Sequence, residues 1–164
     1  GLPRFAAIKS TDVQPAIDLL LADNRALVER LTSDEVPATW NTFAAPLADE
    51  IEQLSRAWGV VGHLHSVNDI PEWREAYNGM LPEVSRFFAE LGQNLKLFAK
   101  YKAIRASAGY TALSPAQRRI IDTAVHAGSI RTILTLVALQ LAIVVTYGLA
   151  KLAMNSLMPS VETP

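Results

Sequence analysis

An uncharged apolar stretch from Ile133 to Ala150 constrains this chain more than any other feature of its sequence. The stretch reads ILTLVALQLAIVVTYGLA, has 18 residues without Asp, Glu, Lys or Arg, and is flanked by Arg131 and Lys151. As a helix it would be about 27 Å long, close to the hydrocarbon thickness of a bilayer. The alternative is a buried core helix, which three amphipathic helices would cover only awkwardly. The stretch therefore predicts a transmembrane helix within residues 129–157 and a short tail at 158–164.

The preceding residues, 1–128, predict a separate helical domain. Apolar residues recur at helical spacing over about 11–31, 39–67, 71–105 and 114–128, and no segment alternates as a half-buried strand would. Pro82 and Gly92 are expected to bend the third of these helices without ending it. The predicted fold is all-α, an antiparallel bundle of about four helices plus one C-terminal transmembrane helix.

Helix start signals support these boundaries. Thr11, Thr39 and Asp69 are candidate N-caps, and Asp69 is followed closely by a proline at 71. Ser114-Pro115-Ala116-Gln117 is the sharpest signal, because Ser at the cap and Gln three residues later form a capping box.

Charge is distributed unevenly along the chain. From Asp12 to Glu90 there are 14 acidic and five basic residues. The segment that leads into the apolar stretch is basic instead, which predicts a collar at anionic lipid headgroups. Its members are Lys96, Lys100, Lys102, Arg105, Arg118, Arg119 and Arg131. By the positive-inside rule the N-terminal domain is cytoplasmic and the C-terminus outside, as in a single-pass protein of a bacterial inner membrane.

Small and weakly polar residues form a stripe along the apolar stretch. Thr135, Ala138, Ala142 and Thr146 follow one another at spacings of three, four and four, and Gln140 adds a polar group. Such a stripe permits close contact with another membrane helix. A plain anchor tolerates the same residues, and the sequence leaves both interpretations open.

Residues with catalytic potential form no recognisable active site. His63 and His65, two apart on a helix, point away from each other, and Asp49, Glu50 and Glu52 fit a solvated face. His126 is a weak candidate ligand for a pigment or haem. The chain has no cysteine, no HExxH and no phosphate-binding loop, and its net charge of −1 disfavours nucleic acid. We expect no enzyme activity, cofactor, metal or small-molecule substrate.

Several segments resemble the thimet-oligopeptidase-like zinc metallopeptidases, oligopeptidase A among them. They are Leu2-Pro3-Arg4-Phe5, Thr39-Trp40-Asn41, SRAWGVVGHLHSV (55–67), PEWREAYNGMLPEVS (71–85), ELGQNLKLFAKYKAIRAS (90–107) and LSPAQRRIID (113–122). The resemblance covers about residues 2–125 and implies an all-α fold. It implies no catalytic or metal-binding residue here, because the zinc site of the family has no counterpart in this sequence.

These observations predict a non-catalytic, membrane-anchored protein. It would act as an accessory, assembly or stabilising subunit of an integral membrane complex, respiratory or photosynthetic. A degenerate or fragmentary peptidase homologue, or a peptidase regulator tethered to the membrane, is the alternative.

Overall fold

The computed structural model describes residues 5–128, which contain helices and no strands. The long helices are α1 (Val13–Leu31), α2 (Ala45–Val67), α3 (Pro71–Gln93) and α4 (Leu95–Ala106), and residues 115–128 are also helical. Shorter helical segments are η1 (Phe5–Ala7), η2 (Ser10–Asp12), η4 (Ala108–Ala112) and the π-helix η3 (Trp40–Ala44), which leads into α2. The predicted all-α fold is confirmed for this part of the chain.

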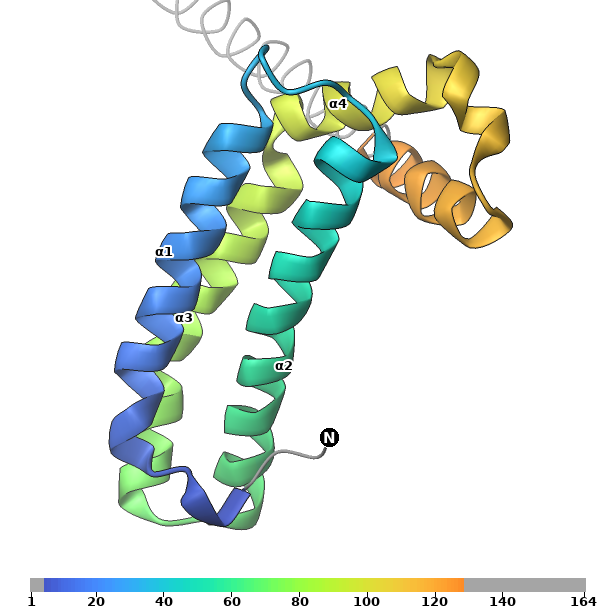
Figure 1. The fold of residues 1–164 in the computed structure, drawn as a ribbon. Coiled ribbons are helices and arrows are strands. Elements are labelled where there is room, and N and C mark those ends of the chain that lie inside the picture. Colours follow the sequence, from blue (N-terminus) through green and yellow to red (C-terminus); the bar gives the residue numbers. More distant parts are fainter. Residues whose placement is uncertain (1–4, 129–164) are drawn as a thin grey trace, which may run out of the picture. The chain divides into compact units, whose positions relative to one another are not determined.

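Helices α1, α2 and α3 lie side by side in alternating directions and pack against one another (Figure 1). Each contributes one apolar face to a shared core, as the helical spacing predicts. The buried members of this core are Val13, Ile17, Leu21, Leu54, Val61, Leu64, Trp73, Met80, Val84 and Phe87.

A second core lies at the end of the bundle where α1 ends and α2 begins. There α4 and the helix that starts at residue 115 pack against η3 and its neighbours. Its buried residues are Leu31, Phe43, Ala44, Leu47, Leu97, Ile104, Ile121 and Val125. The predicted bundle of about four helices is therefore only partly right: α1, α2 and α3 share one core, whereas α4 and the helix at 115–128 belong to the second core at the end of that bundle (Figure 1).

Two of the predicted helix caps are confirmed. The Ser114 backbone N–H donates to Gln117 Oε1 at 2.8 Å, and the Gln117 N–H donates to Ser114 Oγ at 3.3 Å, which completes the capping box. Thr39 Oγ1 accepts a hydrogen bond from the Thr42 N–H at 3.2 Å. Both caps satisfy backbone donors that the first helical turn leaves unpaired.

The other two predicted caps are wrong. Thr11 lies inside η2, where Asp12 Oδ2 accepts from the Lys9 N–H at 2.9 Å. Ile70, not Asp69, precedes α3, and the Asp69 carboxylate pairs instead with Arg74 Nε at 3.1 Å.

The prediction of one helix over 71–105 is also wrong. Pro82 lies within α3, as expected, but α3 ends at Gln93. Asn94 Oδ1 accepts from the N–H groups of Lys96 and Leu97 at 3.0 and 3.1 Å and so caps a new helix, α4. The break lies two residues after Gly92.

Within residues 5–128, no helix is long and apolar enough to cross a membrane. The apolar stretch at 133–150 lies outside the described residues, so the predicted transmembrane helix stays a prediction. The same holds for Thr135, Ala138, Gln140, Ala142 and Thr146, and for Arg131 of the basic collar.

Candidate functional site

The basic residues predicted as a membrane collar differ in the exposure of their side chains and in the contacts that they make within the domain. Within the described part of the chain, Lys96, Lys102, Arg105 and Arg119 are exposed, whereas Lys100 and Arg118 are half-buried. Lys102 Nζ lies 5.3 Å from the centroid of the Phe98 ring, a cation–π contact that leaves the ammonium group in solvent.

Lys100 connects α4 to the segment between α1 and α2. Its ammonium donates to the carbonyl oxygens of Ser33, at 2.8 Å, and Val36. These carbonyls belong to a turn that follows a helix end and has few intrahelical partners. Lys100 is therefore engaged within the domain and is a poor candidate for a headgroup contact.

Asp122, on the helix at 115–128, contacts both Arg105 of α4 and Tyr110. Tyr110 Oη donates to Asp122 Oδ2 at 2.7 Å, and Arg105 Nε forms an ion pair with Asp122 Oδ1 at 3.2 Å. The hydrogen bond to Asp122 raises the pKa of Tyr110, an effect that burial reinforces and that Arg105 and Arg118 oppose. Arg105, like Lys100, is thus engaged within the domain.

The histidines occupy separate environments. His63 lies against the Phe5 ring at a centroid distance of 5.2 Å, while His65 stacks on Tyr77 at 4.4 Å. No group of metal-ligating side chains occurs among residues 5–128. His126 is exposed on the helix at 115–128.

The acidic cluster on α2 has the character of a solvated face. Asp49 and Glu52 are exposed, Glu50 is half-buried, and Glu52 pairs with Arg56 on the next helical turn. Among the aromatic residues, Trp73 and Phe87 are buried, and Trp40, Trp58 and Phe88 pack against the two cores while partly exposed.

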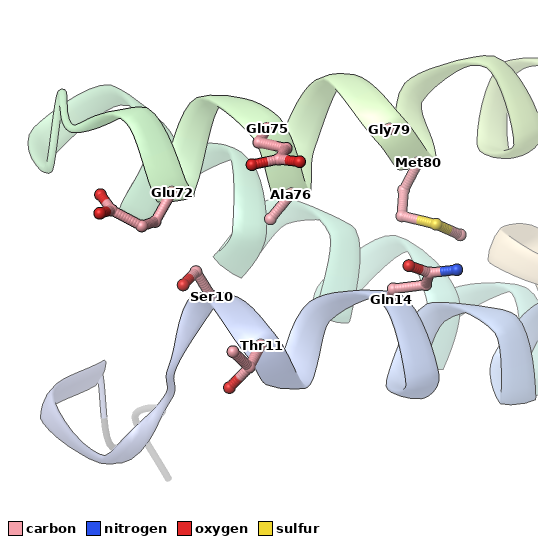
Figure 2. A pocket seen from close by; sticks show the side chains of 8 residues that line it. All are labelled: Ser10, Thr11, Gln14, Glu72, Glu75, Ala76, Gly79 and Met80. Carbon is pink, nitrogen blue, oxygen red and sulfur yellow. The ribbon is translucent and has the colours of Figure 1, made fainter.

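An open groove of about 530 Å³ lies between the start of α1 and the first half of α3. Figure 2 shows Glu72, Glu75 and Ala76 on the α3 side and Ser10, Thr11 and Gln14 on the other. Gly79 and Met80 continue the α3 side by one helical turn. The groove combines two carboxylates, two hydroxyls and one amide with an apolar wall. The groove was not predictable from the sequence, because residues so far apart in the chain meet only through helix packing.

Comparison with known proteins identifies the family of this domain. The model of the neurolysin/thimet oligopeptidase N-terminal domain matches residues 17–139. The chain therefore belongs to this family. The match continues past residue 125, where the resemblance quoted above stops, and overlaps the beginning of the apolar stretch.

The similar curated proteins are much longer than this chain. Oligopeptidase A of Salmonella typhimurium is 38% identical over 126 residues, which are 77% of this chain and 18% of that protein. Oligopeptidase A of Haemophilus influenzae is 36% identical over the same shares. The organellar oligopeptidase A of Arabidopsis thaliana is 34% identical over 73% of this chain and 15% of its own length. The chain thus spans less than a fifth of each relative.

Proposed function

We propose that this chain is a non-catalytic docking protein held at a membrane by its apolar stretch. One observation carries the proposal: an oligopeptidase-type helical domain and an 18-residue uncharged apolar segment occur in the same chain. In this role the chain serves as an accessory, assembly or stabilising subunit of a larger integral membrane complex, respiratory or photosynthetic.

The charge distribution supports an orientation for this subunit. Basic residues between 96 and 131 precede the apolar stretch, and only Lys151 follows it closely. The positive-inside rule then gives a cytoplasmic helical domain and a C-terminus outside, in a bacterial inner membrane. Lys96, Lys102 and Arg119, which are exposed, are the collar residues best placed to contact anionic headgroups.

Contact with the partner complex is proposed to involve the small-residue stripe. Changing Ala138 or Ala142 to Leu would push apart two helices that pack closely through this stripe. Val144→Leu is a matched control, because residue 144 lies about 200° around a helix from Ala142.

Native gel electrophoresis of gently solubilised native membranes tests this contact. The unmodified chain and Val144→Leu are expected to migrate with a large complex, and the Ala138→Leu and Ala142→Leu chains to migrate alone. A chain that migrates alone in every case would refute the accessory-subunit proposal. Unchanged association of the alanine variants would refute the role of the stripe.

The family match favours a second candidate function, that of a degenerate or fragmentary peptidase homologue, or a tethered peptidase regulator. The similar curated proteins are oligopeptidases, and the family match is to an N-terminal domain of the neurolysin/thimet oligopeptidase type. Zinc content and peptide hydrolysis by the purified chain separate the two candidates, since a docking protein has neither. Visible absorbance of the same sample would show a bound pigment or haem, for which His126 is the candidate ligand.

A further inference from the structure

The groove between the start of α1 and α3 has the shape and charge to hold a long cationic side chain. Glu72 and Glu75 are exposed and lie three residues apart on α3, so both carboxylates border the same side of the groove. Neither takes part in an ion pair that the structure gives within residues 5–128. The hydroxyl of Ser10 and the amide of Gln14 add oxygen acceptors on the opposite side (Figure 2).

The wall beside these carboxylates suits the aliphatic part of such a side chain. Ala76 and Met80 provide apolar surface, and Gly79 leaves the groove open between them. A Cβ atom added to Gly79 would meet nothing within 4 Å. Lysine and arginine side chains bury their methylene stems along apolar surface and keep the charge at a polar rim.

Two other grooves in the described part of the chain are less suited to a cation. In the groove near the end of α1, Arg25 and Glu90 already form a pair at 3.9 Å, so part of its charge is internally compensated. The groove along α4 is bordered by Lys96 and Lys100. The Glu72–Glu75 groove has two carboxylates and no Lys, Arg or His among the described residues that line it.

We propose that this groove binds a lysine or arginine side chain from a basic cytoplasmic loop of the partner membrane protein. The inference rests on the proposed function, because cytoplasmic loops of integral membrane proteins carry an excess of Lys and Arg. It also agrees with the charge of the bundle, where 14 acids and five basic residues lie between Asp12 and Glu90. The acidic bundle attracts the loop over a distance, and the groove holds one of its side chains.

A binding titration with the full chain in uncharged lipid nanodiscs tests the inference. The probe is a fluorescent lysine-rich peptide of about ten residues, followed by fluorescence anisotropy at low salt. A second peptide replaces each lysine with 2,3-diaminopropionate, which carries an amine on a much shorter stem. The groove predicts about fivefold weaker binding of the short-stem peptide, because its amine cannot reach the carboxylates while its stem lies on the wall.

Two variants and two matched controls locate the binding. Glu72→Gln combined with Glu75→Gln is expected to weaken lysine-peptide binding about tenfold, as loss of two exposed ion pairs allows. Gly79→Leu is expected to weaken it similarly by filling the groove, and open space at its Cβ keeps the helix intact. The controls are Asp34→Asn with Glu35→Gln, which removes equal charge from the α1–α2 linker, and Gly59→Leu, which adds an equal side chain to α2.

Binding within twofold of the unmodified chain in both controls, with loss in both groove variants, supports the proposal. Equal loss in the charge control would show that only the general acidic field attracts the peptide, and would overturn it. Unchanged binding in Gly79→Leu, or equal affinity for both peptides, would also overturn it. The titration contains no membrane partner, so its result is independent of the co-migration test of the accessory-subunit proposal.

Discussion

Replacing Lys100 with methionine tests how much the hydrogen bonds between α4 and the segment joining α1 to α2 stabilise the domain. The change keeps most of the side-chain volume and removes an ammonium that donates to the carbonyls of Ser33 and Val36. A hydrogen bond from a charged donor contributes about 1.5–3 kcal/mol, and partial exposure of Lys100 places each of these at the low end or below. The expected loss for the pair is about 2 kcal/mol of unfolding free energy. For a domain of this size that loss lowers the Tm by on the order of 8 °C.

Thermal unfolding of the full chain in detergent, followed by circular dichroism at the helical band, measures this loss. Lys102→Met is the control, because it removes an equal charge from an exposed site on the same helix whose contact is the face of Phe98. Its Tm should change by less than about 2 °C, in keeping with the small contributions of exposed charges. Equal Tm values for the two variants would refute the role given to Lys100.

Three further substitutions test contacts at particular positions. Ser114→Ala should cost about 1 kcal/mol of unfolding free energy in denaturant titration, because it removes one half of the capping box with Gln117; an unchanged value would contradict the cap. Asn24 is 1% exposed, its Nδ2 donates to the Leu20 carbonyl at 2.8 Å, and its Oδ1 has no hydrogen-bond partner within residues 5–128. Asn24→Leu removes one hydrogen bond together with one unsatisfied buried oxygen, so it should raise the unfolding free energy by no more than about 1 kcal/mol. A less stable Asn24→Leu protein would show that the hydrogen bonds of Asn24 outweigh the cost of its unsatisfied Oδ1. Because the pKa of Tyr110 is raised in the folded protein, the unfolded chain loses the phenolic proton at a lower pH than the folded chain does. The unfolding free energy should therefore fall as the pH rises past 10.0, the ordinary pKa of tyrosine. Tyr110→Phe should make that fall shallower in unfolding measured across alkaline pH, and an identical slope would show that the bond to Asp122 does not persist.

Local signals in the sequence predicted most helix boundaries. The capping box at Ser114 and the cap at Thr39 were predictable because each depends on residues three apart in the chain. The helix break at Asn94 was not predicted, because apolar residues recur at helical spacing on both sides of it. A single asparagine within such a pattern is not a clear signal for the end of a helix. Asp69 lies one residue before the N-cap position of α3, which is Ile70. A shift of one residue hardly alters the sequence signal for a helix start, but it turns the Asp69 carboxylate toward Arg74 instead of the first backbone N–H groups.

Long-range contacts could not be predicted in the same way. Lys100 meets carbonyls 64 and 67 residues earlier, and backbone carbonyls have no signature in the sequence. The Glu72–Glu75 groove depends equally on how α3 lies beside the start of α1. The charge asymmetry was visible in the sequence, but which charges are already paired became clear only from the fold.

Membrane fractionation of the full chain and of a chain lacking residues 129–164 tests the central claim most directly. The account predicts that the full chain stays in the membrane pellet after an alkaline carbonate wash, which strips peripheral proteins. The shortened chain should move to the supernatant and keep a cooperative thermal transition at the helical band of circular dichroism, because the buried residues that the structure gives for both cores reach only to Val125. A shortened chain that remains in the washed pellet, or a full chain that is washed off, would contradict the account.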